Sequence, residues 1–161
     1  MSDALTPRHM REVLATATTT YARLLAGGLV LAVGDAPQPT VDVGLVAHGD
    51  ARTLYRDRRP VCRSLDGVCS IQDRRRQCAG CDDRALCTAQ IRVDFTCDAR
   101  AYRLLLARTS ARNYLLYERL LARRSLRLDH VRTRLTVVDR GAWGELRFAL
   151  LPDGPRTTPR N

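Results

Sequence analysis

The stretch IRVDFTC, residues 91–97, alternates apolar and polar side chains without interruption. A period of two residues places the apolar side chains on one face of an extended chain and the polar ones on the other, which is the pattern of a half-buried β-strand. Cys97 falls on the apolar face and is expected to be a small buried side chain rather than a metal ligand. Residues 101–107 follow as a second predicted strand. The centre of the chain therefore predicts a mainly β fold.

The sequence after these two strands predicts a helix and another pair of strands. Ser110 is a suitable N-cap for the helix, which ends in a basic pair. Its apolar stripe comprises Tyr114, Tyr117, Leu120 and Leu121. Strands are then expected at 131–138 and 143–151, joined by the short turn Asp139-Arg140-Gly141. The tail from residue 152, which is rich in proline, is expected to be disordered.

The sequence before the two central strands divides into a helical and an extended part. Apolar residues recur at helical spacing over 7–26, from a Thr-Pro start to Gly27-Gly28, and predict an amphipathic helix. Strands are expected at 29–33 and 41–47. The turn-rich segment 34–39 separates them and favours a hairpin.

From residue 41 onward the expected order is strand, cysteine-rich insert, strand, strand, helix, strand, strand. Five strands with a helix between the third and fourth is the order of an OB-fold, a partly open barrel that binds oligonucleotides. The organisation that we expect is an N-terminal helix and strand appendage at 1–36, an OB-like domain at 37–151 with the cysteine-rich insert at 52–90, and a tail at 152–161. A mixed α+β sheet is the alternative.

The charge of the chain indicates a polyanionic partner. Its 161 residues include 27 basic and 17 acidic ones, which gives a formal charge of +10. Nucleic acid is the leading candidate, and the alternatives are an acidic protein or a charge that serves solubility alone. The first residues lack the apolar segment of a secretory signal, and no apolar run approaches the roughly 20 residues that span a bilayer. We expect a cytoplasmic protein with no membrane contact.

Most of the cysteines gather in the insert, which is too polar to fold by hydrophobic burial alone. Because a reducing cytoplasm disfavours disulfides, metal binding is their expected role. Cys78 and Cys81 form a CxxC turn, which presents two thiolates at the separation that a tetrahedral ion needs. Together with Cys87 and Cys62 they predict a structural zinc site. Cys69 is the possible substitute for Cys62.

This part of the chain resembles zinc-containing OB-like proteins encoded by phages and mobile elements, which are thought to bind single-stranded DNA. The resemblance rests on the run CxSxDG at 62–67, the CxxC of Cys78 and Cys81, and Cys87. It implies an OB-type barrel, a structural zinc ion and single-stranded DNA as the ligand, and Cys69 lies outside its pattern. The order of elements is also similar to the zinc-bearing OB domain of the large subunit of replication protein A, whose metal module lies between the first two barrel strands.

A second resemblance carries a different implication. The spacing Cys78-x2-Cys81-x5-Cys87 and the phrase Gly141-Ala-Trp-Gly144 resemble WhiB-like iron–sulfur regulators. That resemblance implies a cluster in place of zinc and a transcription regulator that reads duplex DNA.

Single-stranded nucleic acid is held by a positive groove and by aromatic faces on which bases stack. The predicted nucleic-acid-binding residues are Arg74, Arg75, Arg76, Arg92, Arg132, Arg134, Arg147, Trp143 and Tyr55. The strand arginines share an outward-facing parity, and the run 74–76 precedes the CxxC, so a bound metal would order it. The alternatives are a solvated charge run at 74–76 and a Trp143 that closes one end of the core.

We therefore expect a non-enzymatic single-stranded DNA-binding protein of a replication, recombination or mobile-element system. The alternatives are a metal-containing transcription regulator and an interaction module whose helix at 7–26 contacts a partner or a second copy. An enzyme is not expected, because the sequence contains no HxE beside the cysteines, no HExxH and no P-loop. Four thiolates would also leave zinc no open coordination position.

Overall fold

A long strand, β4 (Thr40–Arg56), organises the fold of residues 19–152, which are the residues that the computed structural model describes. The other elements are β1 (Thr20–Tyr21), β2 (Arg23–Leu25), β3 (Gly28–Val30), β5 (Arg59–Ser64), the 3₁₀ turn η1 (Asp82–Leu86), β6 (Thr88–Cys97), β7 (Arg100–Ala107), α2 (Arg108–Arg123), the 3₁₀ turn η2 (Leu128–His130), β8 (Arg132–Asp139) and β9 (Gly144–Leu150). The described part of the chain is mainly β, as the alternation of its sequence predicts.

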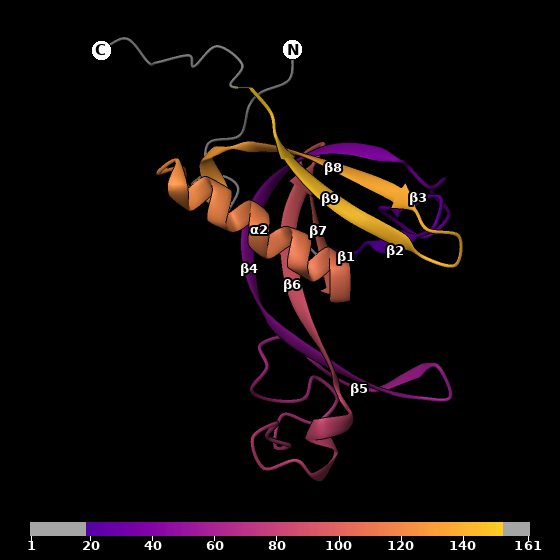
Figure 1. Ribbon diagram of the computed structural model, residues 1–161. Coiled ribbons are helices and arrows are strands. Elements are labelled where there is room, and N and C mark those ends of the chain that lie inside the picture. Colours follow the sequence, from indigo (N-terminus) through magenta and orange to yellow (C-terminus); the bar gives the residue numbers. More distant parts are fainter. Residues whose placement is uncertain (1–18, 153–161) are drawn as a thin grey trace.

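Three neighbouring strands pair with successive parts of β4, all of them antiparallel. Residues 40–44 pair with β8, residues 44–53 with β6 and residues 52–56 with β5. The resulting seven-stranded sheet has the order β1-β7-β6-β4-β8-β9, with β5 attached to the far end of β4. Strand β4 therefore runs out of the main sheet and into a second lobe, which lies below it in Figure 1.

The core of the protein lies between the main sheet and α2. Tyr114 and Tyr117 of α2 are buried there, and both rings pack against Phe148 of β9, with ring centroids 5.3 and 5.8 Å apart. Phe95 of β6 and Leu146 of β9 are fully buried in the same cluster. Burying a large apolar side chain contributes about 1.5–3 kcal/mol, so this cluster carries the stability of the upper lobe. The four strands predicted after the cysteines are confirmed as β6, β7, β8 and β9.

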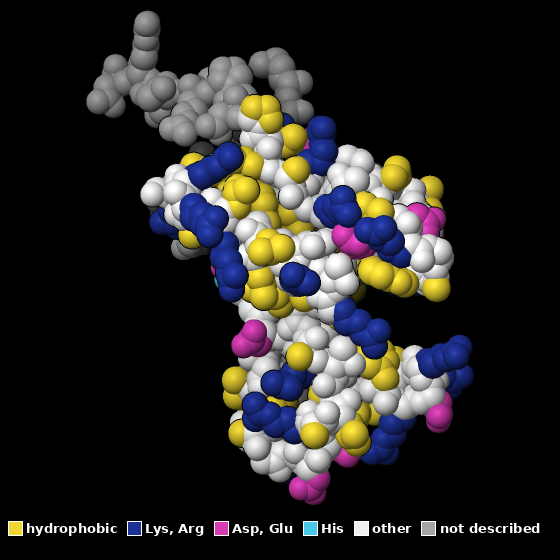
Figure 2. Space-filling view, in the orientation of Figure 1, with side chains coloured by type: hydrophobic (Ala, Val, Ile, Leu, Met, Phe, Trp, Pro, Cys, Tyr) yellow, Lys and Arg dark blue, Asp and Glu magenta, His cyan; other side chains and the backbone are white. Residues whose placement is uncertain are grey.

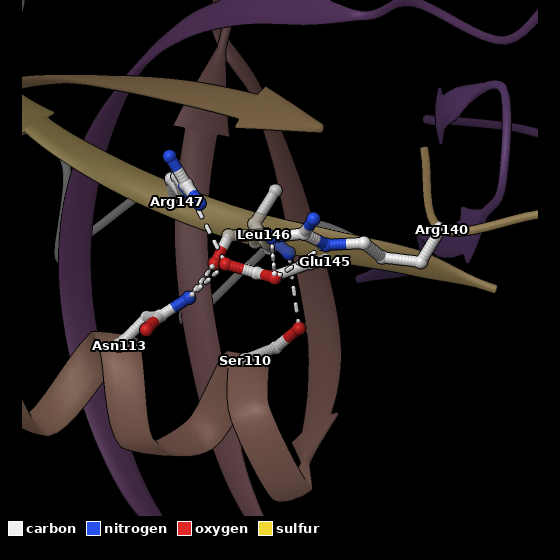
Figure 3. Close-up of polar contacts among 6 residues, drawn as sticks. All are labelled: Ser110, Asn113, Arg140, Glu145, Leu146 and Arg147. Atoms are coloured by element: carbon white, nitrogen blue, oxygen red, sulfur yellow. Dashed lines mark hydrogen bonds and ion pairs between the residues drawn. The ribbon is translucent and has the colours of Figure 1, made fainter. Parts of the chain in front are cut away.

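The N-terminus of α2 covers the outer edge of β9 (Figure 3). The hydroxyl of Ser110 accepts a hydrogen bond from the backbone N–H of Leu146 at 3.0 Å, and the side-chain amide of Asn113 donates to the Leu146 carbonyl at 3.0 Å. The prediction that Ser110 is the N-cap is wrong, since Ala107 holds that position and the hydroxyl serves β9 instead. These contacts occupy backbone groups that a further strand would need.

The sheet is not closed into a barrel. Within residues 19–152 no ladder joins β7 to β9, and the free side of β7 pairs in parallel with the short β1. The five-stranded OB-like barrel is therefore not confirmed, whereas the mainly β fold with a helix between β7 and β8 is.

The predicted helix at 7–26 is wrong for its last residues, and its first part, up to residue 18, lies outside the described residues. Residues 23–25 and 28–30 form the hairpin β2–β3, which turns at Ala26-Gly27. Gly28 has a φ of 152°, and a Cβ atom there would lie 2.7 Å from the backbone of Gln38, so this position requires glycine. The predicted hairpin between 29–33 and 41–47 is also wrong, because β3 pairs with β2 instead.

The lower lobe, residues 54–87, is the cysteine lobe, and it lies between the paired residues Thr53 of β4 and Thr88 of β6. Its interior is small, since Leu54, Ser64 and Ser70 are among its few buried side chains. Its larger apolar side chains Val61, Val68, Ile71 and Leu86 are exposed. Apolar burial alone gives this lobe little stability. The predicted tail beyond Pro152 lies outside the described residues.

Candidate metal centre and nucleic-acid interface

Four of the six cysteines line a single small cavity in the cysteine lobe. Cys62 comes from β5, where it pairs with Leu54 of β4. Cys78 and Cys81 lie on the tight turn before η1, and Cys87 directly follows η1. The cavity measures about 20 Å³. The four residues that the sequence predicts as ligands are therefore neighbours in space.

Short backbone hydrogen bonds fix the turns that carry these cysteines. The N–H of Cys78 donates to the carbonyl of Val68 at 2.7 Å, which ties the CxxC to the preceding loop. The N–H of Arg84 donates to the Cys81 carbonyl at 3.0 Å, and the N–H of Cys87 donates to the Arg84 carbonyl at 3.2 Å. Local turns thus fix the backbone at Cys78, Cys81 and Cys87, whereas Cys62 is positioned by strand β5.

The other two cysteines lie apart from this cavity. The thiol of Cys69 lies 3.7 Å from the carboxylate of Asp66, which also accepts hydrogen bonds from the N–H groups of Val68 and Cys69. Burial, followed by the charge of Asp66, raises the pKa of the Cys69 thiol. Cys97 lies at the end of β6, where it is half buried and contacts Asp98. Of the two candidates for the fourth ligand, Cys62 is the one that lines the cavity.

Arginine side chains surround the cavity. Arg52, Arg76 and Arg84 line it together with the cysteines. The guanidinium of Arg76 lies 3.1 Å from the Cys81 sulfur and 2.9 Å from the carboxylate of Asp83, and these two contacts raise the pKa of Arg76. Four thiolates around a divalent ion carry a net negative charge, which guanidinium groups at this distance offset.

The chemistry of the cavity fits a single zinc ion, although the thiols are not yet in ligand positions. A volume of about 20 Å³ is the space of roughly one water molecule. Four sulfur donors form a typical structural zinc site. Within residues 19–152, no group of three or more His, Cys, Asp or Glu side chains is already arranged to hold a metal ion. Binding would require these side chains to rearrange, and a space for roughly one water molecule fits one ion rather than a multi-iron cluster.

A second feature is a notch between the two lobes. The turn between β8 and β9, residues 140–143, and the turn between β4 and β5, residues 57–58, project to the same side of the molecule (Figure 1). The space-filling view shows the notch between them, with arginine side chains above and below it (Figure 2). Asp57 and Arg58 both have positive φ angles, of 50° and 62°, which is the backbone of a tight type I′ hairpin turn. The lower tip is therefore a well-defined projection.

Aromatic side chains are exposed on both hairpins and on β1. Trp143 on the upper hairpin and Tyr55 on the lower one are 46% and 44% exposed. Tyr21 of β1 is 41% exposed, and the guanidinium of Arg63 from β5 lies over its ring at 5.7 Å. Exposed aromatic faces beside arginines are the groups on which unpaired bases stack.

Most of the predicted sheet arginines are held by carboxylates of the same sheet. Arg134 forms two hydrogen bonds with Asp42, at 2.7 and 2.9 Å. Arg147 donates to one carboxylate oxygen of Glu145 at 3.0 Å, and Arg140 donates to the other at 2.9 Å from the opposite side (Figure 3). These contacts lower the pKa of Glu145 to about 2, with the hydrogen bond from Arg140 as the largest cause. The sheet face is therefore less positive than the sequence suggests.

Two further predicted arginines are also engaged in contacts. Arg92 donates to the backbone carbonyl of Leu65 at 2.7 Å and lies 3.3 Å from Asp94, so it ties β6 to the cysteine lobe. Arg76 faces the cysteines, with its guanidinium 3.1 Å from the Cys81 sulfur. The remaining predicted arginines are exposed and have no ion pair among the described residues; they are Arg74, Arg75 and Arg132.

Sequence reasoning missed Tyr21 and Arg63. Tyr21 fitted the helical spacing predicted over 7–26, whereas the preceding run of threonines, residues 18–20, is a signal for a strand. Arg63 was not distinguished from the many other arginines, because only the pairing of β5 with β4 brings it toward β1.

Comparison of the chain with protein-family models, with curated proteins and with solved structures finds no match. In the part of the chain that the structure describes, no helix is long and apolar enough to cross a membrane.

Proposed function

We propose that this chain is a non-enzymatic protein that binds single-stranded DNA in the notch. The observation that carries the proposal is the pair of hairpins that flank the notch, each with an exposed aromatic side chain, Trp143 above and Tyr55 below. Arg56, Arg58 and Arg59 on or beside the lower tip add positive charge. The whole chain has a formal charge of +10, which favours a polyanionic ligand.

The order of the elements supports the same proposal. The path β7-β6-β4-β8-β9, with a helix between β7 and β8, is the strand order of an OB-fold that has been left open between its third and fifth strands. We propose that the main sheet is such an opened OB-type sheet. Its two long hairpins then correspond in place to the loops with which OB-folds bind oligonucleotides.

We further propose that Cys62, Cys78, Cys81 and Cys87 bind one structural zinc ion. The ion would supply the stability that the small interior of the cysteine lobe lacks. Because Cys62 belongs to β5, the ion would also hold the lower side of the notch in place. Its role is structural, since four protein ligands leave no position for a substrate.

The test is a titration of the purified full chain against a fluorescently labelled oligo-dT of about 15 nucleotides, followed by anisotropy. We expect binding that weakens steeply between about 50 and 200 mM salt, and a duplex of the same length should bind more weakly. Absence of binding at low salt would contradict the proposal. Preference for the duplex would favour a regulator that reads double-stranded DNA.

A further inference from the structure

Helix α2 has a second apolar face that the core does not use. Its inward face packs against the core and carries the buried side chains Ser110, Tyr114, Tyr117 and Leu121. On the outward face, Leu115, Leu116 and Leu120 are 44%, 52% and 38% exposed. Single exposed leucines are common, but Leu116 and Leu120 lie four residues apart and form an apolar strip along the helix, with Leu115 to one side of it.

A groove of about 360 Å³ lies along this strip. Its lining residues are Leu116, Arg119, Leu120, Arg123 and Arg124. None of these three arginines forms an ion pair with another residue of the segment 19–152. This contrasts with Arg134 and Arg147 of the sheet, which carboxylates neutralise. The groove therefore combines an apolar floor with a rim of free positive charge.

The combination of leucines and unpaired arginines in the groove favours one class of ligand over the others. An amphipathic peptide that carries leucine-like side chains and carboxylates would cover the leucines and pair with the arginines at the same time. Nucleic acid would pair with the arginines but leave the leucines uncovered, and the aromatic rings of α2, Tyr114 and Tyr117, are buried and cannot stack on bases. A second copy of this basic chain would bring further positive charge to the rim. Charge complementarity thus favours an acidic protein segment.

We propose that the groove on α2 formed by Leu116, Leu120 and the three arginines at 119, 123 and 124 is a docking site for an acidic amphipathic segment of a partner protein. The site is separate from the notch, because no residue that lines the groove belongs to the two hairpins or to β1. The inference goes beyond DNA binding, and it would link the DNA-bound chain to a second protein.

The probe is a fluorescein-labelled helical peptide of about 15 residues, made of Leu, Glu and Ala with Leu at i, i+4 and i+7. We expect it to bind the full chain with micromolar affinity. The charge-reversed peptide, in which Lys replaces Glu, should bind at least about tenfold more weakly. In the ¹⁵N-labelled chain the acidic peptide should shift the amide signals of residues 115–124.

Three variants separate the proposal from its competitors. Arg119→Glu/Arg123→Glu and Leu116→Ala/Leu120→Ala should each weaken peptide binding about tenfold or more and leave oligo-dT binding unchanged. Arg112→Glu, on the same helix but outside the groove, should change peptide binding by less than about twofold. The proposal is overturned if neither double variant weakens the peptide, if the Lys peptide binds equally well, or if oligo-dT displaces the peptide from 115–124. It is also overturned if sedimentation shows a dimer that Leu116→Ala/Leu120→Ala dissolves.

Discussion

Arg63 lies over the ring of Tyr21, with its guanidinium carbon 5.7 Å from the ring centroid. Arg63 directly follows Cys62 in β5, and Tyr21 belongs to the strand that pairs with the edge of β7, so this contact joins the cysteine lobe to the main sheet. An exposed cation–π contact contributes about 0.5–1 kcal/mol. It is weak enough for a stacked base to replace it.

The first prediction concerns this ring. Tyr21→Ala should weaken oligo-dT binding about tenfold, because loss of one stacking face costs about 1–3 kcal/mol per base. Trp143→Ala should have an effect of similar size. Fluorescence anisotropy at a fixed salt concentration measures both. The control is Leu86→Ala, which removes an exposed apolar side chain of the cysteine lobe and should bind oligo-dT normally. If the control loses as much affinity as Tyr21→Ala, Tyr21 does not contact the DNA.

The second prediction distinguishes the notch from the sheet face. Arg59→Ala at the lower hairpin should reduce the slope of log affinity against log salt by about 0.7, which is the contribution of one phosphate contact to a single strand. Arg132→Ala should leave the slope unchanged, since Arg132 begins β8 at the end of the strand away from the 140–143 turn. Salt titrations of both variants provide the measurement. The opposite pattern would place the DNA on the sheet face.

The third prediction concerns the metal centre. Cys78→Ser and Cys81→Ser should each lower the zinc content from one ion per chain to nearly none, and the thermal unfolding midpoint should fall, because the lobe loses its main source of stability. Oligo-dT binding should weaken when zinc is lost, because β5 contains Cys62 and is also one strand of the lower hairpin. Elemental analysis by mass spectrometry and circular dichroism measure these effects.

Two cysteines outside the cavity serve as matched controls for the metal centre. Cys69→Ser and Cys97→Ser should keep full zinc content. If Cys69→Ser loses the ion and Cys62→Ser keeps it, the ligand set is wrong. A brown protein with iron in place of zinc would instead favour a cluster.

The fourth prediction concerns acid stability. The pKa of Glu145 is lowered from 4.5 to about 2 by Arg140 and then Arg147, so the folded state favours its charged form. Its contribution to stability is present above pH 4.5, the unfolded value, and is lost as the pH falls toward about 2. Glu145→Gln should therefore lower the unfolding midpoint most at pH 7, and the difference from the natural chain should shrink below pH 4.5. A difference that stays constant between pH 7 and 3 would contradict this role.

The sequence predicted the strands in which apolar and polar side chains alternate. The sequences of β6 and β8 alternate between apolar and polar side chains, and this two-residue period marks them as strands. β4 was predicted only as far as residue 47. Its second half contains His48, Gly49 and Asp50 and is extended because it pairs with β6 and β5, which local pattern does not reveal.

The candidate sites were predictable to different degrees. Cysteine spacing was sufficient to select four residues that line one cavity, since the CxxC turn and η1 are local structures. The arginines were less predictable, because the carboxylate that holds Arg134 comes from strand register and the contact of Arg92 with the cysteine lobe comes from tertiary structure. Asp42 faces Arg134 across a ladder, and Arg92 lies beside Asp94 and reaches the backbone of the cysteine lobe.

The pairing of Thr53 with Thr88 makes the cysteine lobe separable from the main sheet. The two ends of the cysteine lobe are neighbours in one ladder, so the whole lobe is a hairpin extension that enters and leaves the sheet at one place. A short turn could replace it without altering the register of β4 against β6 and β8. The lobe therefore has the geometry of an insertion whose removal leaves the two ends of the main sheet in place to be joined by a turn.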